Sequence, residues 1–532
     1  MRIVNHARVP DLDFEVRRHL VLVGTNAVGK TTVIRALNAL LKASTSQLHA
    51  WFGPDMLRDQ AAPLVVEATL TGLDNEDKGW FADDVEVLTT PAGPQMQLTI
   101  RLTVTLDQID PELKTVQREF VKVAVARPVR PNQLSAIGWS YLPADRSADR
   151  ELGGGRTGTA RALLAEVDLG SEAADLRTAL GQYQTVLDKA SALVTLRESI
   201  ATALSAVYPR QVNRDDMSVQ LRDVDGEALL GDVDIHIRTD RGPVRLHQQS
   251  DGLRALTTIA LHQVHRRAAR IVAVDEPEVH LHPRAQARIG AVLAEVPQAI
   301  LATQSPQVLA AFRPSEIVAF APDGTIRQVP LNLDEDWKFR QHSWLDSTLE
   351  PLTARALVAV EGISDRVLLH ALARASALDL DQAGISVVVV NGATNFGPPL
   401  RLFGPAGFNI AMLTLVDEAE AAIVAGVLGC AFADLDKHNV LISRTDLEDE
   451  YVRGLGVPRV LDALEASGMY DRRAIVGACR VSDEKDITEQ SLANWCRQGK
   501  IKVAAALATQ ITAADAAAIP VIVDLMKRLR AL

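Results

Sequence analysis

The chain has 532 residues, a length typical of about three or four domains. Hydrophobic residues make up 47% and charged residues 23% of the sequence, and the formal net charge of −11 argues against a protein that binds nucleic acid over its whole surface. The three cysteines (Cys430, Cys479 and Cys496) have no CxxC spacing, which argues against a disulfide framework or zinc ribbon and favours a reducing, cytoplasmic setting. No signal peptide or apolar membrane span is predicted.

The first predicted unit contains a phosphate-binding loop. The apolar run 19–23 predicts a buried strand, and residues 30–42 have the apolar spacing of a helix. Between them, the sequence from Gly24 to Thr31 matches GxxxxGK[ST] in full. In this motif backbone N–H groups wrap the phosphates, the lysine reaches the β- and γ-phosphates, and the threonine hydroxyl is a ligand of Mg²⁺. The motif predicts an ATP–Mg²⁺ site, with candidate residues Asn26, Gly29, Lys30, Thr31 and Thr32.

A second ATPase element follows the apolar run 271–274. Asp275 and Glu276 come directly after it, in the Walker B arrangement. The aspartate of that arrangement holds Mg²⁺ through water, and the glutamate orients the attacking water. A strand that ends in a solvated acidic turn is the alternative, but the complete phosphate loop favours the ATPase interpretation.

The rest of the first unit contains further predicted strands, helices and turns. A polar stretch at 332–350 with two tryptophans predicts a linker to a second unit. The other predicted elements are strands at 64–72, 97–105 and 299–302, a glycine-rich break at 151–158, helices across 159–208 and a hairpin around Asp323 and Gly324.

The second unit alternates strands and helices. Such alternation predicts a parallel sheet whose ligands bind at the carboxyl ends of the strands. Glu361 follows the first strand, and Asp365 lies one helical turn further on, so both can face one metal ion. Asp417 ends a later strand. The predicted elements are strands at 356–360, 385–390 and 410–416, with helices at 365–375 and from 419 onward.

The ATPase motifs resemble a known family. The segments Asp275–Pro283 and Ala302–Pro306, with Tyr141–Arg146, are similar to ABC-type ATPases of the OLD (overcoming lysogenization defect) family and their RecF/SMC-like relatives. The family usually has a histidine that senses the γ-phosphate where this chain has Gln304. A glutamine can hydrogen-bond a phosphate oxygen but carries no charge, so slower hydrolysis or altered gating is expected.

The same resemblance implies a dimer. In dimeric ABC-type ATPases a Ser–Gly helix start contacts the γ-phosphate bound by the opposite subunit, and Ser250 and Gly252 occupy that position here. A simple helix cap is the alternative for these residues. The helical insertion falls where the family carries a dimerisation element. His280 and His282 are expected in a structural or dimer-contact role rather than as metal ligands.

The second unit resembles a Toprim domain. Val360–Asp365 is similar to its first motif, but Ala419 replaces the second acid of the usual Asp-x-Asp after Asp417. Either Glu418 or Glu420 can compensate, although strand alternation argues against Glu418. The metal ligands implied by these motifs and by the downstream acidic element 446–451 are Glu361, Asp365, Asp417 and Glu448, for Mg²⁺ or Mn²⁺. Residues 499–507 resemble the region of the family's catalytic lysine, for which Lys502 is preferred over Lys500.

The resemblance implies a homodimeric or larger ATP-dependent, metal-dependent DNA endonuclease, related to Gabija-type nucleases and acting in phage defence or DNA processing. A helicase-like partner is compatible with it, and no membrane is involved. The basic stretches 265–270 and 127–130 are candidate DNA contacts, or solvated faces. The alternatives are an ATP-switched DNA-binding or regulatory protein with a degenerate Toprim domain, and a nuclease that acts on RNA.

The predicted fold class is α/β: an ABC-type P-loop ATPase domain with a helical insertion, followed by a carboxy-terminal Toprim α/β domain with a parallel sheet. The expected boundaries are 1–158 and 211–335 for the two parts of the ATPase domain, 159–210 for the insertion, 336–351 for the linker and 352–532 for the Toprim domain.

Overall fold

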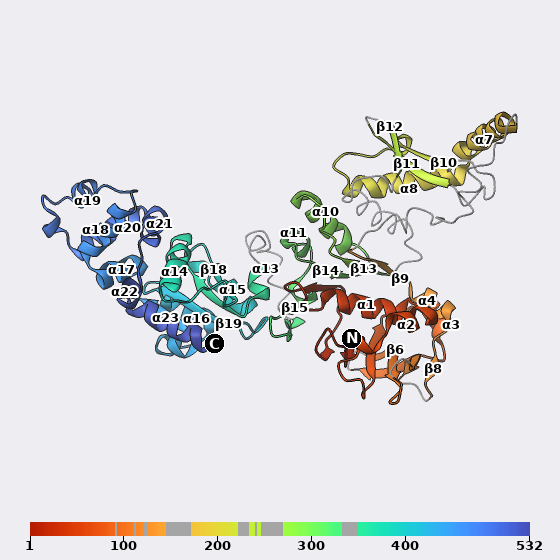
Figure 1. Ribbon diagram of the computed structural model, residues 1–532, viewed down its shortest axis with the longest axis horizontal. Coiled ribbons are helices and arrows are strands. Elements are labelled where there is room, and N and C mark those ends of the chain that lie inside the picture. Colours follow the sequence, from red (N-terminus) through yellow and green to blue (C-terminus); the bar gives the residue numbers. More distant parts are fainter. Residues whose placement is uncertain are drawn as a thin grey trace. The chain divides into compact units, whose positions relative to one another are not determined.

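The computed structural model describes residues 1–90, 93–110, 113–121, 125–144, 172–221, 233–239, 242–245, 270–331 and 349–532 (Figure 1). The chain divides into two compact units, Met1–Ile317 and Val318–Leu532. Within the described ranges, no helix combines the length and the apolar character that a membrane span requires. The predicted α/β fold class, in which a unit built on a parallel sheet follows a first unit, is confirmed.

The first unit contains four adjacent parallel strands that position the phosphate-binding loop. Three of these strands are short and mostly apolar, as expected for parallel strands that are covered on both faces, whereas the fourth contains the partly buried Ser140 and Tyr141. Helix α1 (Lys30–Leu41) follows the first strand and buries Val33, Leu37 and Leu40. In spatial order the strands are β3 (Leu20–Val23), β14 (Gln298–Ala302), β13 (Ile271–Asp275) and β9 (Trp139–Leu142).

An antiparallel sheet forms the other layer of this unit. Alternating burial along β6 shows one face turned to the core. The predicted strands at 64–72 and 97–105 are confirmed as β4 and part of β6. The sheet order is β2 (Leu12–Asp13), β1 (Arg2–Val4), β4 (Leu64–Thr71), β6 (Gly93–Leu106), β7 (Lys114–Val121) and β8 (Arg127–Pro128), with β5 (Glu86–Thr90) paired to β6.

Shorter helices complete the first unit, and part of the predicted insertion is helical. Its helices α7 (Glu172–Lys189) and α8 (Ser191–Val207) accompany a three-stranded antiparallel sheet, β10 (Met217–Leu221), β11 (Val233–Thr239) and β12 (Gly242–Arg245). The dimerisation role of this insertion stays a prediction. The remaining helices are α2 (Thr45–Trp51), α3 (Asn75–Phe81), α4 (Pro131–Ile137), α10 (Pro283–Ala294) and α11 (Pro306–Leu309).

The predicted hairpin around Gly324 is confirmed. Strands β15 (Ile317–Phe320) and β16 (Ile326–Gln328) pair antiparallel, and the φ of 82° at Gly324 is one that glycine adopts without strain. The predicted linker lies mostly outside the described residues, which resume with α13 (Leu349–Thr353).

The second unit is built on a four-stranded, all-parallel sheet, as predicted. Its order is β18 (Ile385–Val389), β17 (Ala356–Val360), β19 (Ala411–Asp417) and β20 (Val440–Ser443). Both faces of the sheet are covered: one packs against α14, α17, α18 and the later helices, and the other against α15 and α16. The carboxyl ends of β17 and β19 therefore lie side by side at one edge of a rigid sheet.

Most of the second unit beyond this sheet is helical. The helices are α14 (Ile363–Ala375), α15 (Gly397–Phe403), α16 (Ala421–Leu428), α17 (Leu447–Leu455), α18 (Val457–Ala466), α19 (Arg472–Ala478), α20 (Glu489–Gln498), α21 (Lys500–Ala508), α22 (Ala513–Ala517) and α23 (Pro520–Ala531).

Candidate functional site

The phosphate-binding loop connects β3 to α1 and is closed around its lysine. The Lys30 ammonium donates hydrogen bonds to the carbonyls of Gly24 and Thr25, both at 2.8 Å. Gly29 has a φ of 102°, and a Cβ there would lie 2.1 Å from Cγ1 of Val9, so only glycine fits. Burial lowers the pKa of Lys30, although nearby acids oppose this effect. The loop thus holds a cation ready for an incoming phosphate.

The Walker B acids lie next to this loop. Asp275 ends β13, is almost fully buried and accepts a hydrogen bond from the Thr31 hydroxyl at 3.0 Å. Burial raises the pKa of Asp275, and the Thr31 hydrogen bond partly offsets that effect. Glu276 has a φ of 45°, an uncommon left-handed conformation for a residue other than glycine. The residues predicted to hold Mg²⁺, Thr31 and Asp275, are in direct contact.

Gln304 is also brought to the phosphate-binding loop. Its side-chain amide donates to Oδ1 of Asn26 at 2.5 Å. Glu278 holds the segment that carries Gln304. Its two carboxylate oxygens accept hydrogen bonds from the Gln304 backbone N–H at 2.5 Å and from the Thr303 hydroxyl at 2.8 Å. Sequence reasoning did not select Glu278. Its only signal was a second acid two residues after Glu276.

Replacing Glu278 with alanine is expected to slow ATP hydrolysis about tenfold, because Gln304 is no longer held beside Asn26. The substitution also leaves two donors without an acceptor, at a cost of about 1–3 kcal/mol for each buried group. Melting temperature and steady-state hydrolysis measure the two effects. Glu278→Gln keeps one acceptor oxygen and should lie between the parent and the alanine variant. Parent-like behaviour of Glu278→Ala would contradict this role.

A cavity of about 480 Å³ adjoins the loop at Thr32. Its polar lining includes two arginines, Arg8 and Arg35, and its aromatic lining can contact a flat ring. A nucleotide whose phosphates lie in the loop can place its base here. The remaining lining residues are His6, Ala36, Asn38, Ala39, Trp51, Phe52, Asp55, Met56, Tyr141 and Pro143.

Three carboxylates meet at the sheet edge of the second unit. Glu361 follows β17, Asp417 ends β19, and Glu420 immediately precedes α16. One oxygen from each lies within 4.8 Å of the other two. Of the two alternatives for the acid missing at Ala419, the structure therefore brings Glu420 into the cluster.

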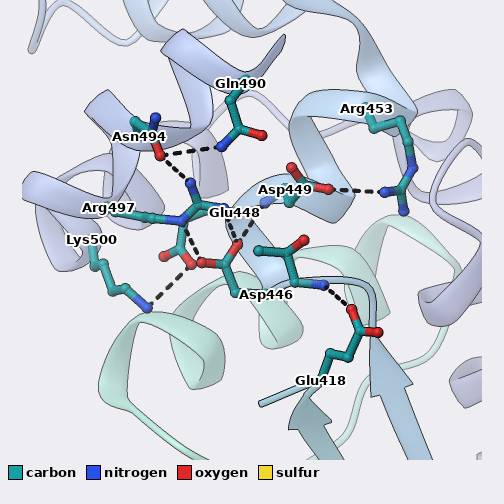
Figure 2. A network of polar contacts seen from close by, with 10 residues as sticks. Glu418, Asp446, Glu448, Asp449, Arg453, Gln490, Asn494, Arg497 and Lys500 are labelled. Atoms are coloured by element: carbon teal, nitrogen blue, oxygen red, sulfur yellow. Dashed lines mark hydrogen bonds and ion pairs between the residues drawn. The ribbon is translucent and has the colours of Figure 1, made fainter.

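Glu418 lies elsewhere and accepts a hydrogen bond from the Thr445 backbone N–H at 3.2 Å (Figure 2). Strand alternation argues against Glu418, and its position in the structure agrees. Glu420 lies beyond the end of β19, where the chain has already turned, so alternation does not explain why Glu420 joins the cluster.

This carboxylate cluster fits a hard divalent cation. Burial, together with the neighbouring Glu420 and Asp365 carboxylates, raises the pKa of Asp417 to about 8. Burial and then Glu420 raise the pKa of Glu361. Oε2 of Glu420 is buried without a hydrogen-bond partner among the residues described. Carboxylates crowded in this way repel one another, and a bound cation would remove the repulsion.

Asp365 borders this cluster and also caps a helix. Its Oδ2 accepts the Gly362 backbone N–H at 2.9 Å, which fixes the turn from β17 into α14. Burial raises the pKa of Asp365, and the Gly362 hydrogen bond and the charge of Lys500 partly offset this rise. One oxygen is therefore held by the backbone, and the other receives a weaker hydrogen bond from Ser364 at 3.3 Å.

A lysine and an arginine complete the site (Figure 2). Lys500, the first residue of α21, forms an ion pair with the buried Glu448 at 3.3 Å. Arg497 donates from Nε and Nη2 to the two oxygens of Asp446, at 2.5 and 2.9 Å. Burial would raise the pKa of Asp446, but the Arg497 hydrogen bonds and the Asp449 N–H outweigh that effect and lower it. The sequence placed Asp446 in the acidic element 446–451 without giving it a role, and it did not single out Arg497.

The structure places Lys500, and not the preferred Lys502, beside the carboxylates. The Lys502 ammonium lies 5.0 Å from the centroid of the Tyr470 ring, whereas Lys500 faces the carboxylates. Although burial would lower the pKa of Lys500, the charges of Glu448, Asp417 and Asp365 raise it. Residues two apart on a helix differ by about 200° in direction, so Lys500 and Lys502 cannot share a face.

The structure does not place the other predicted residues at the phosphate-binding loop or at the carboxylate cluster. Ser250, Gly252 and the basic residues 265–269 fall outside the described part of the chain, as do the last two residues of 141–146. In the second basic patch, Arg127 forms an ion pair with Asp83 at 3.2 Å.

The two sites define a class of protein: a P-loop ATPase unit followed by an acidic, Toprim-like unit. Comparison with protein families agrees. Residues 142–310 match the AAA domain described as a putative AbiEii toxin of a type IV toxin–antitoxin system. Residues 352–418 match the Toprim domain of overcoming lysogenization defect protein-like proteins. This pair of matches fits an OLD-family ATPase–Toprim fusion, and both domain types are typical of hydrolases that use nucleotide and divalent metal.

Solved structures give further similarities. The C-terminal region of the Burkholderia pseudomallei OLD protein is 26% identical over 34% of this chain and 98% of its own, with a TM-score of 0.28. The corresponding region from Xanthomonas campestris pv. campestris is 24% identical over 34% and 98%, with a TM-score of 0.28. An Smc head domain from Pyrococcus furiosus is 13% identical over 64% and 98%, with a TM-score of 0.40. Among curated proteins, the comparison finds no match.

Proposed function

We propose that this protein is an ATP-regulated, metal-dependent DNA endonuclease. The observation that carries the proposal is the cluster of Glu361, Asp417 and Glu420, whose oxygens lie within 4.8 Å of one another beside Lys500. Acids gathered at the carboxyl ends of parallel strands, with a lysine nearby, match what phosphodiester hydrolysis requires.

Each residue has a distinct role in this proposal. Glu361, Asp417 and Glu420 would hold a first Mg²⁺ or Mn²⁺, and Asp365 and Glu448 are the nearest candidates for a second. When bound, such ions activate water and stabilise the departing oxygen of a phosphodiester. Lys500 offers its positive charge to the phosphate in the transition state. The Asp446–Arg497 pair fixes the helix start from which Glu448 projects.

In the ATPase unit, Lys30, Thr31 and Asp275 would bind the triphosphate and its Mg²⁺, and Glu276 would orient the attacking water. Gln304 takes the γ-phosphate sensor position without a charge. ATP then serves as a signal that controls the nuclease. A homodimer, with Ser250 and Gly252 acting across it, and a role in phage defence or DNA processing belong to the same proposal.

A plasmid-nicking assay tests this function. The purified protein is incubated with supercoiled plasmid and Mg²⁺ or Mn²⁺, with and without ATP, beside Lys30→Ala, which should no longer bind nucleotide. We expect nicking that requires metal and responds to ATP only when Lys30 is present. Cleavage of a structured RNA but not of DNA would favour the RNA alternative. Failure to cut either nucleic acid with any metal would leave an ATP-switched regulatory protein as the better interpretation.

Metal affinity should depend strongly on pH. With a pKa of about 8, Asp417 is mostly protonated below that pH, so binding a cation must release a proton. We expect Mn²⁺ affinity to rise by up to about tenfold per pH unit towards pH 8 and then to level off. Calorimetry in two buffers of different ionisation enthalpy measures the released proton. Asp417→Asn should bind Mn²⁺ more weakly and with a smaller pH dependence, and equal affinity of the parent at pH 6 and pH 8 would contradict the prediction.

The same pKa sets the sign of the stability change. An unfolded aspartate has a pKa of about 3.9, so between roughly pH 4 and pH 8 the folded protein binds more protons at Asp417 than the unfolded chain does. The metal-free protein should therefore lose stability as the pH rises through this window.

A further inference from the structure

Two aromatic side chains and a lysine meet beside the start of α21. Tyr470 lies just before α19 and Trp495 lies on α20. Their ring centroids are 5.2 Å apart and their planes meet at 74°. The Lys502 ammonium lies 5.0 Å from the centroid of the Tyr470 ring. These three residues form an aromatic–lysine cluster that the proposed hydrolysis does not use.

The charge of Lys502 is not neutralised by the protein. Among the described residues, no carboxylate lies within ion-pair distance of its ammonium, and its side chain is exposed. Neighbouring cations do have acidic partners. Lys500 pairs with Glu448, and Arg497 pairs with the carboxylate that caps the start of α17. Arg472 contacts three acids. Lys502 thus remains available to an anion that approaches from solvent.

The cluster borders the carboxylate site. A Cβ at Gly499 would lie 3.8 Å from the Tyr470 hydroxyl, so Tyr470 rests against the residue that precedes Lys500. Lys500 and Lys502 are separated by about 3 Å along the axis of α21 and point to different sides of it. A strand whose phosphate lies at Lys500 would reach the aromatic–lysine cluster by crossing the start of α21 at Gly499, where there is no side chain.

We propose that the cluster of Tyr470, Trp495 and Lys502 is a stacking platform for an unpaired base of the DNA strand that is cut. The proposal rests on the proposed nuclease function and names its preferred substrate. Aromatic faces stack on every base, but a base held inside a duplex offers them no face. Lys502 leaves the Tyr470 ring for a phosphate, since a cation–π contact at an exposed site is weak. The enzyme then prefers single strands, gaps or flaps over intact duplex.

Both rings also pack against the core, so the test must separate stacking from folding. Tyr470→Leu removes the aromatic face, whereas Tyr470→Phe keeps it and loses only the hydroxyl. Cleavage with Mn²⁺ is followed on one sequence as a single strand, as a duplex, and as a series of single strands in which one abasic residue moves past the cut site. Melting curves show whether each variant is folded.

For the parent and Tyr470→Phe, we expect a lower KM for the single strand than for the duplex, and one abasic position that raises KM about tenfold. Tyr470→Leu should already show this raised KM on the intact single strand, and the abasic residue should not raise its KM further. Its kcat should equal that of the parent. If Tyr470→Leu does not fold, Lys502→Met carries the test through a raised single-strand KM at constant kcat.

A flat abasic profile in a parent protein that cuts DNA would overturn the platform alone. The platform is also overturned if Tyr470→Leu, or Lys502→Met in its place, changes KM equally for single strand and duplex. A parent that cuts no DNA overturns the nuclease proposal, and the platform with it.

Discussion

Replacing Glu361 with glutamine is expected to abolish plasmid nicking, with a loss of at least about a thousandfold. Glu361 is the member of the carboxylate cluster that follows β17, and it shares the cluster with Asp417 and Glu420. The amide keeps the size of the side chain but removes the charge that a divalent cation requires. Because burial raises the pKa of Glu361, the variant should be at least as stable as the metal-free parent.

A matched control lies close by. Glu418 is next to Asp417 in sequence but accepts a hydrogen bond from Thr445 and lies outside the cluster. Glu418→Gln should therefore nick plasmid at nearly the parent rate. ATP hydrolysis by both variants, measured in the same preparations, should remain at the parent level. Nicking by Glu361→Gln at more than a few per cent of the parent rate would show that the cluster is not the seat of the chemistry.

The parts of the fold that sequence predicted best are those where neighbouring residues alone decide the structure. The loop Gly24–Thr31 needs glycine at Gly29, because of its backbone conformation and the contact with Val9, so the motif itself carries the geometry. Glu361 and Asp417 could be placed together because the carboxyl ends of adjacent parallel strands meet at one edge. In both cases the residues of the motif themselves determine the geometry that was predicted.

The residues that the sequence left as alternatives or did not select have a different origin. Glu420 reaches the cluster because the chain turns after Asp417, and strand alternation does not give the direction of a turn. Glu278 and the Asp446–Arg497 pair act through contacts between segments 26 or 51 residues apart, and composition and spacing do not reveal such contacts. The short strands β1 and β2 likewise depend on their partners in the sheet.

Lys500 illustrates the limit most sharply. Gly499, Lys500 and Lys502 could be recognised as the region of a catalytic lysine, but the rotation of α21 about its own axis decides which lysine faces the acids. That rotation is set by burial of Val503, Ala504 and Leu507 against the core of the second unit. Two lysines only two residues apart on a helix point in different directions, so one can face the site while the other faces away from it.

Lys500→Met is accordingly expected to lower the rate of DNA cleavage by about a hundredfold to a thousandfold at saturating substrate, the loss typical when one transition-state donor is removed. Lys502→Met should leave that rate within about threefold of the parent, because Lys502 lies over Tyr470 and not at the carboxylates. Single-turnover cleavage with Mn²⁺ separates this rate from substrate binding. The reverse order of effects would restore Lys502 as the catalytic lysine.

The loss in Lys500→Met must be distinguished from a loss of folding, because the substitution leaves Glu448 buried without its ion-pair partner. Removing one member of a buried pair costs about 3–5 kcal/mol in fully buried cases, and less here because Lys500 is partly exposed. Adding Glu448→Gln to Lys500→Met removes the unpaired charge and should recover the melting temperature. Because Glu448 is itself a candidate metal ligand, Glu448→Gln alone is the control. If that single variant still cuts DNA and the equally stable double variant does not, Lys500 acts in the chemistry. If activity returns with stability, its role is to hold Glu448 in the folded site.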